Sequence, residues 1–194
     1  MPMAGFFRVC VSIVFLVGFS TVFVTAQSTA KHEDPAFDPT PPGLIDFRAK
    51  SFPDTGVADL SGDWFIFWNK LLPPESFEAM ARADVAAHAD GVFSIPRTWN
   101  NWEYNDRPVG GQGYATFVVD LLLPRGMDRA ALWIPNASTA YALWVDGDLV
   151  AHNGVPGRNR EDSRPHYVMK TAGFPVTDGR ARIVLQLLHR QAKI

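Results

Sequence analysis

The stretch GGQGYATFVVDLLLPRGMDRAALWIPNASTAYALWVDGDLVAHNG, residues 110–154, indicates the fold class. It holds three or four short apolar runs in succession, with no segment of helical period between them. Within residues 114–123 every second side chain is apolar and falls on one face of a strand: Ala115, Phe117, Val119, Leu121 and Leu123. Asp146-Gly147 lies between two runs and predicts a type I′ hairpin, because both central residues of that turn need positive φ.

Further strands are predicted on both sides of this stretch. Their ranges are 64–68, 92–95, 130–134, 140–145, 149–151, 166–169 and 182–188. A short helix is predicted over 76–87, with Ser76 as its N-cap. Because no helix of crossover length separates the strands, we predict an all-β antiparallel sandwich rather than a parallel α/β sheet.

The first 26 residues predict an export signal. Arg8 is their one charge, residues 9–24 are apolar, and Val24-Thr25-Ala26 offers a small-residue cleavage site. The apolar run is shorter than the roughly 20 residues that span a bilayer, so we expect cleavage, with an uncleaved anchor as the alternative. The single cysteine, Cys10, lies inside this segment. Export without disulfides favours a bacterial periplasm or the outer face of the inner membrane.

Residues 27–59 predict a linker or extended lead-in, because they are polar and rich in proline and lack strand or helix periodicity. The 135 residues from Leu60 to Ile194 are enough for one domain with its own core and too few for two. The domain organisation expected is therefore a signal peptide (1–26), a linker (27–59) and one sandwich domain (60–194).

The charge distribution argues against a nucleic-acid partner. Without the signal the chain has 17 basic and 20 acidic residues, and the basic ones are interspersed rather than clustered on one face. Membrane contact is expected only through an uncleaved signal or through transmembrane segments absent from this sequence.

No catalytic, metal or cofactor site is predicted. The acidic pairs Glu103 with Asp106 and Glu161 with Asp162 lie in loops beside arginines, which is typical of solvated charges. The histidines lack the H-x-H and HExxH spacings of zinc sites, and Ser138 lacks a G-x-S-x-G context. We therefore expect a protein that is not an enzyme.

The aromatic loop 97–113 is the main candidate for ligand binding. Sugars present apolar C–H faces surrounded by hydroxyls, so their sites combine flat rings with amides, carboxylates and guanidiniums. The candidate ligand-binding residues of this loop are Trp99, Asn100, Asn101, Trp102, Tyr104 and Asp106. The alternative is that Trp99, and less so Trp102 and Tyr104, close the end of the sandwich as core residues.

A second candidate loop, 152–165, follows the predicted hairpin. It contributes His152, Asn153, Arg158 and Arg160 as candidate ligand-binding residues. Because loops cluster at the two ends of a sandwich, this loop can flank the aromatic one. The alternative is a solvated loop in which Glu161 and Asp162 balance the arginines.

Five segments, in order, carry a resemblance to a known family: LSGDW (60–64), IPRTW (95–99), GQGYATF (111–117), AYALWVDG (140–147) and VLQ (184–186). The sequence resembles the periplasmic sensor domain of bacterial seven-transmembrane receptors with diverse intracellular signalling modules. More distantly, it is similar to the sugar-binding domain of β-galactosidases and β-glucuronidases. Arg97 and Thr98 depart from the glycine and serine usual in the receptor family.

This resemblance implies a galactose-binding-like jelly roll that recognises a carbohydrate or another small polar ligand and signals its occupancy to a membrane-embedded output. The receptors continue into transmembrane helices after the last strand, whereas this sequence ends at Ile194. Two functions are expected: a carbohydrate-sensing receptor domain without its membrane and output parts, or an accessory sugar-binding domain of a glycoside hydrolase whose catalytic domain is absent.

Overall fold

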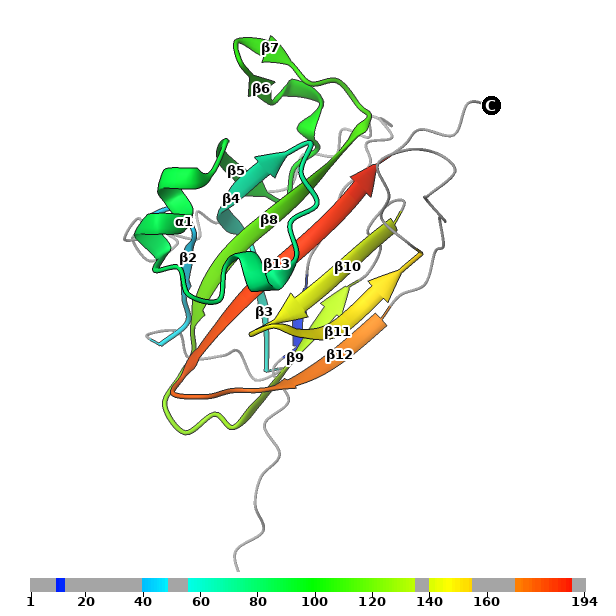
Figure 1. The fold of residues 1–194 in the computed structure, drawn as a ribbon. Coiled ribbons are helices and arrows are strands. Elements are labelled where there is room, and N and C mark those ends of the chain that lie inside the picture. Colours follow the sequence, from blue (N-terminus) through cyan, green and yellow to red (C-terminus); the bar gives the residue numbers. More distant parts are fainter. Residues whose placement is uncertain (1–9, 13–39, 49–55, 135–139, 155–169, 190–194) are drawn as a thin grey trace, which may run out of the picture.

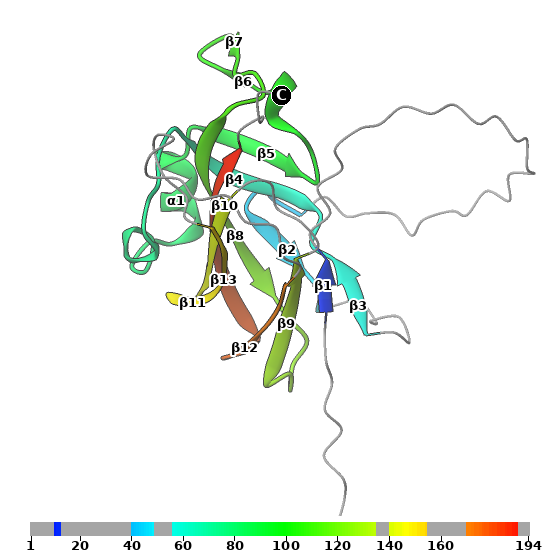
Figure 2. The same ribbon diagram turned by 90° about the vertical axis from the view of Figure 1, so that its right-hand side faces the viewer.

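The protein is an all-β sandwich in a computed structural model, as the sequence predicts (Figure 1). The structure describes residues 10–12, 40–48, 56–134, 140–154 and 170–189. Two sheets face each other, and Figure 2 shows them edge-on as separate layers. A short helical segment lies on the outer side of the larger sheet (Figure 1).

The larger sheet has seven strands in the described part of the chain. Its main path runs β11 (Asp148–Asn153), β10 (Ala140–Val145), β13 (Arg180–His189), β8 (Gly113–Leu122), β4 (Gly62–Trp68) and β5 (Gly91–Ile95), all antiparallel. The seventh strand, β2 (Leu44–Asp46), pairs in parallel with the last residues of β8.

The smaller sheet has the order β12 (Lys170–Pro175), β9 (Arg129–Ile134), β1 (Cys10–Ser12) and β3 (Val57–Asp59). Strand β1 pairs in parallel with both of its neighbours, so this sheet is mixed. A two-stranded hairpin, β6 (Glu103–Tyr104) and β7 (Arg107–Pro108), stands apart from both sheets.

Most predicted strands are confirmed, and the corrections concern short segments. Strands β2 and β3 lie within the predicted linker, and β1 lies within the predicted signal segment. Three-residue strands are too short to show a period of two, so the polar and proline-rich context concealed them. Strand β12 was not predicted, and the strand predicted over 166–169 lies outside the described residues.

The sandwich core lies between the two sheets. All five side chains predicted to share one face of the strand over 114–123 are buried there, which confirms the predicted alternation. The smaller sheet covers them with Ala130, Leu132, Ile134, Ala172 and Phe174.

The outer face of the larger sheet is covered by residues 69–90, which we call the strap. It contains the 3-10 turn η1 (Pro74–Ser76) and the helix α1 (Arg82–His88). Phe77 and Val85 of the strap pack with Phe65, Val118 and Val184 of the sheet in a second apolar cluster. This face is therefore shielded from solvent by the strap rather than by a second sheet.

The helix predicted over 76–87 is wrong in its start. Ser76 ends η1 rather than capping a helix, and α1 begins only at Arg82. The Asp84 carboxylate accepts the Ala81 N–H at 3.1 Å and so satisfies one donor at the helix start. Only Val85 of α1 is buried, which accounts for the irregular apolar pattern of the segment.

Polar side chains of the sheet bind the strap backbone near its start. Thr116 Oγ1 accepts the Leu72 N–H at 2.9 Å and donates to the Lys70 carbonyl at 2.8 Å. Gln186 Nε2 donates to the Leu72 carbonyl at 3.0 Å. These bonds satisfy strap backbone groups that have no partner in a helix or sheet.

Arg182 on β13 binds the middle of the strap. Its Nε and Nη2 donate to the two Asp120 carboxylate oxygens at 2.7 and 3.0 Å. Its Nη1 donates to the carbonyls of Phe77 and Met80 at 2.6 and 2.7 Å. The hydrogen bonds to Asp120 raise the pKa of Arg182, so the guanidinium stays charged. One cation thus joins β13, β8 and the strap.

The β10–β11 turn confirms the prediction from Asp146-Gly147, since both residues have positive φ, 49° and 90°. Asp146 Oδ1 accepts the Arg182 N–H at 2.7 Å, and the Asp146 N–H donates to the Arg182 carbonyl. Partial burial raises the pKa of Asp146, and the negative charges of Asp120 and Asp148 add to this, against the opposing effect of the Arg182 amide.

Among the helices of the described residues, none has the length and apolar character needed to cross a bilayer.

We expect Arg182→Ala to lower the free energy of unfolding by about 2 kcal/mol, because it leaves a half-buried carboxylate and two strap carbonyls without their donor. Arg180→Ala is the matched control: Arg180 is exposed, and its side chain makes no hydrogen bond within the described part of the chain. Urea-induced unfolding measures both. Equal losses in the two variants would contradict the role given to Arg182.

Asp146→Asn is expected to stabilise the protein at pH 7 by a few tenths of a kcal/mol, a figure kept small because the side chain is only partly buried and solvent screens its charge. Because the pKa of Asp146 is raised in the folded state, its contribution to stability is present below the ordinary aspartate pKa of 3.8 and is lost as the pH rises through the folded-state pKa. Asparagine removes this loss and tolerates positive φ.

The difference in free energy of unfolding between Asp146→Asn and the unchanged chain should therefore become smaller as the pH falls toward 3.8. Urea unfolding at pH 7 and pH 4 measures this difference. Asp178→Asn, also at a positive-φ turn position, serves as the control. An advantage that is the same at both pH values would be the contrary result.

Candidate functional site

Four aromatic side chains close the end of the sandwich at which β4 ends and β8 begins: Trp68, Trp99, Trp102 and Tyr104. The Trp68 ring centroid lies 5.1 Å from that of Trp99 and 5.8 Å from that of Trp102. Trp102 lies 6.0 Å from Tyr104. The rings therefore form a continuous row that leads from the core to the β6–β7 hairpin.

Trp99 lies at the inner end of this row and belongs to the core. It begins the 3-10 turn η2 (Trp99–Asn101) and is only 5% exposed. Its ring stacks on Phe117 with an interplanar angle of 8° and meets Trp68 edge-on. Trp99 thus provides packing rather than an exposed stacking face, as the core alternative in the sequence analysis stated.

The β6–β7 hairpin carries the outer end of the row. Asn105 and Asp106 occupy its two central positions with φ of 52° and 57°, the conformation of a type I′ turn. Tyr104 pairs with Arg107 across the hairpin, and the Val109 N–H donates to the Trp102 carbonyl at 3.0 Å. The sequence predicted only a loop here, although Asn-Asp between two short segments is a recognisable hairpin signal.

Trp102 packs against the edge strand of the larger sheet. Its Nε1 donates to the Val92 carbonyl of β5 at 3.3 Å. Gly91 allows this approach, since a Cβ at that position would lie 3.2 Å from Trp102 Cζ2. An edge strand presents unpaired backbone groups that favour association, and the indole covers one of them.

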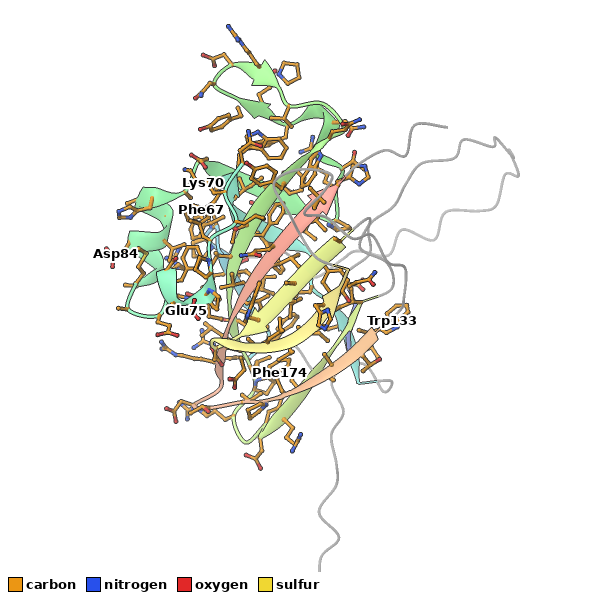
Figure 3. All side chains as sticks on the ribbon, turned by 45° about the vertical axis from the view of Figure 1, so that its right-hand side comes forward. Phe67, Lys70, Glu75, Asp84, Trp133 and Phe174 are labelled. Atoms are coloured by element: carbon orange, nitrogen blue, oxygen red, sulfur yellow. The ribbon has the colours of Figure 1, made fainter. Side chains whose placement is uncertain are left out.

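Asp90 holds the polar side of the aromatic row. Its carboxylate accepts the Trp68 N–H at 2.9 Å and pairs with Lys70 Nζ at 2.9 Å. Tyr104 donates its hydroxyl to Asp90 Oδ1 at 3.5 Å. Lys70 lies near the hairpin end of the molecule (Figure 3). Tyr104 is therefore fixed by Trp102 at its face and by Asp90 at its hydroxyl.

Sequence reasoning missed Asp90 and Lys70, because both belong to the strap and not to the aromatic loop. Lys70 follows β4 and Asp90 precedes β5, which are neighbouring strands. One signal could have found Asp90 and Lys70. Both are polar, and they lie at the two ends of a segment that connects paired strands.

The other predicted residues of the loop lie around the aromatic row. Asn100 and Asp106 are exposed, and Asn101 is the last residue of η2. Asn100 Oδ1 lies 3.3 Å from the position that a Cβ on Gly111 would take, so the two sides of the loop meet there. Amide and carboxylate groups thus accompany the half-buried rings of Trp102 and Tyr104.

His152 and Asn153 end β11, where His152 is exposed and Asn153 is buried. The register places Asn153 in one row with Tyr141 of β10, Leu187 of β13 and Ala115 of β8. The segment after β11 therefore leaves the same end of the sheet as the aromatic loop, three strand spacings or about 14 Å away. The predicted residues Arg158 and Arg160 lie outside the described residues.

The chemistry of the aromatic end is stacking and hydrogen bonding. Among the residues that the structure describes, no group of three or more His, Cys, Asp or Glu side chains is placed to hold a metal ion. Nearby Tyr141 is fully buried, and burial raises the pKa of its phenol, so this residue is neutral at physiological pH.

No protein-family model and no curated protein matches this sequence. Solved structures similar to the chain include β-glucuronidases. That of an uncultured Clostridium species is 12% identical over 66% of this chain and 21% of that chain, with a TM-score of 0.45. The Ruminococcus gnavus enzyme in complex with D-glucuronic acid is 10% identical over 67% of this chain and 21% of that chain, with a TM-score of 0.47. The Faecalibacterium prausnitzii enzyme is 16% identical over 66% of this chain and 20% of that chain, with a TM-score of 0.45.

The chain spans about a fifth of the length of these enzymes. Likeness at this level assigns neither a family nor a ligand to the chain. The resemblance to receptor sensor domains stays a prediction.

We expect Trp102→Ala to shift the protein toward larger species in size-exclusion chromatography with light scattering, because it uncovers the β5 edge. Tyr104→Ala removes the neighbouring ring without touching that edge and is the control. Thermal melts confirm that both variants are folded. If both variants keep the elution of the unchanged chain, Trp102 does not protect the edge.

Proposed function

We propose that this protein binds carbohydrate without catalysing a reaction, and that its ligand stacks on the outer face of Tyr104. The observation that carries the proposal is the near-parallel Trp102–Tyr104 pair, with an interplanar angle of 18°. Trp102 covers one side of Tyr104, so the hairpin holds the tyrosine ring as a fixed platform.

Polar groups suited to sugar hydroxyls surround this platform. Glu103, Asn105, Asp106 and Arg107 of the hairpin are all exposed. Carboxylates accept hydrogen bonds, guanidiniums donate them and amides do both, which matches the mixed character of a hydroxyl. Asn100 supplies a further amide at the base of the loop.

The proposal includes export to the periplasmic side of a bacterial inner membrane and a sensing role within a receptor. Ligand can then act on an output only through a difference in affinity between two conformational states. Strand β11 ends at Asn153 on the same end of the sheet as this platform.

A glycan array of the full chain, followed by titration calorimetry with the best glycan, tests this site. Tyr104→Ala should weaken binding about tenfold, since a lost stacking contact of this kind is worth roughly 1 kcal/mol or more. Tyr104→Phe keeps the ring and should retain most of the affinity.

Trp133→Ala is the matched control, because Trp133 is 36% exposed and lies on β9 of the other sheet (Figure 3). Absence of any glycan ligand, or equal affinity of Tyr104→Ala and the unchanged chain, would contradict the proposal.

The alternative is an accessory sugar-binding domain of a glycoside hydrolase. The two readings share the site and differ in what the gene encodes after Ile194. Repeated apolar spans of about 20 residues favour the receptor. A βα pattern with catalytic glutamates favours the hydrolase.

A further inference from the structure

A cleft of about 650 Å³ lies between the strap, β2, the outer face of β8 and β13, and the β10–β11 turn. Its size falls within the range of small-molecule sites. It contacts β8 at Asp120, seven residues or about 23 Å along the strand from the aromatic end. The cleft is therefore separate from the proposed saccharide site.

The lining of the cleft is partly apolar, and its polar groups come from different elements. The apolar lining residues include Leu44, Met80 and Val184. Arg180 and Arg182 come from β13, Asp146 from the turn, and Glu78 and Arg82 from the strap. A few polar groups from different elements beside apolar side chains are typical of a binding site rather than of a gap in packing.

Arg182 supplies a fixed donor to this cleft. Four of its five N–H groups donate to Asp120, Phe77 and Met80. The fifth, on Nη2, has no partner within the described part of the chain. Because the other four hold the guanidinium in place, a ligand carboxylate pays little ordering cost at this donor.

Asp146 and Glu78 supply acceptors on the side of the β10–β11 turn. Asp146 Oδ1 accepts the Arg182 N–H, and its second oxygen has no partner among the described residues. Glu78 Oε1 lies 3.4 Å from the position that a Cβ on Gly147 would take, so its carboxylate stands over the turn. The two carboxylates thus gather at one side of the cleft.

The cations occupy the other side. Arg82 donates to the Pro42 carbonyl at 2.9 Å beside β2, and Arg180 pairs with Leu122 near the end of β8. Arg182 and Asp120 neutralise each other, which leaves Arg82 and Arg180 against Glu78 and Asp146. The cleft has no net charge, but its two signs are separated.

We propose that this cleft binds a small zwitterion, a molecule with one carboxylate and one ammonium group, such as a free α-amino acid or a very short peptide. The ligand carboxylate binds the Arg182 and Arg180 guanidiniums, and its ammonium binds Asp146 and Glu78. A simple anion would lie close to the carboxylates of Asp146 and Glu78 without a positive group of its own to pair with them. A simple cation would likewise lie close to the guanidiniums without a negative group to pair with them. None of the described residues that line the cleft is aromatic, so the flat face of a sugar lacks here the platform that Tyr104 offers.

Titration calorimetry of the full chain with each common α-amino acid, and with dipeptides, tests the proposal. For any compound that binds, the matching α-hydroxy acid lacks the ammonium and the matching amino alcohol lacks the carboxylate. Each analogue should bind at least about tenfold more weakly, as expected for loss of a charge-assisted hydrogen bond. Equal binding of either analogue, or no binding of any zwitterion, overturns the proposal.

Asp146→Asn tests the site itself, because it keeps the acceptor for the Arg182 N–H and the turn conformation while removing the charge. We expect it to weaken zwitterion binding about tenfold. Asp178→Asn makes the same change at a positive-φ turn position outside the cleft and should leave the affinity unchanged. Equal affinity in both variants overturns the assignment to this cleft. Glycan binding is measured separately, so failure of one proposal is distinct from failure of the other.

Discussion

The contact on which the arrangement of this molecule depends is the bidentate pair of Arg182 and Asp120. These residues lie opposite each other on the central strands β13 and β8, on the face that points away from the sandwich core. A charged pair on a sheet face is ordinarily solvated and contributes little. Here the strap covers it and adds two backbone carbonyls as further acceptors, so the guanidinium is nearly saturated. The strap has little regular structure of its own, and its position follows from this cation and from Thr116 and Gln186.

The same constraint reaches both ends of the sheet. Toward the β10–β11 turn, the backbone of Arg182 exchanges hydrogen bonds with Asp146, which fixes the turn beside the cleft. Toward the aromatic end, the strap finishes at Asp90, whose carboxylate receives the Trp68 N–H and the Tyr104 hydroxyl. The strap thus connects the two proposed ligand sites, which are far apart on the sheet surface and share no residue.

The sequence predicted well whatever depends on local pattern. The alternation of Phe117, Val119 and Leu121 and the turn at Asp146-Gly147 both appear in the structure as expected, since period and backbone preference are properties of neighbouring residues. It failed where pairing partners are distant. Strands β2 and β3 are recognisable only from the neighbours they pair with, and Asp90 joins the aromatic row only because β4 and β5 bring the two ends of the strap together. Trp99 and Tyr104 are five residues apart and both have polar neighbours in the sequence. Trp99 nevertheless lies in the core, whereas Tyr104 is half-buried at the surface. That difference depends on the direction in which the chain leaves β5, which composition does not encode.

Strand β1 relates the predicted cleavage of the chain to the hydrogen bonding of the smaller sheet. Cys10–Ser12 pairs with β9 on one side and β3 on the other, so β3 joins this sheet only through β1. These three residues also lie within the segment predicted to be removed on export. Proteolysis after Ala26 would take the strand with it, leaving β9 with an open edge and β3 without a neighbour. If the predicted cleavage takes place, the cleaved and uncleaved chains therefore differ in an exposed sheet edge as well as in length.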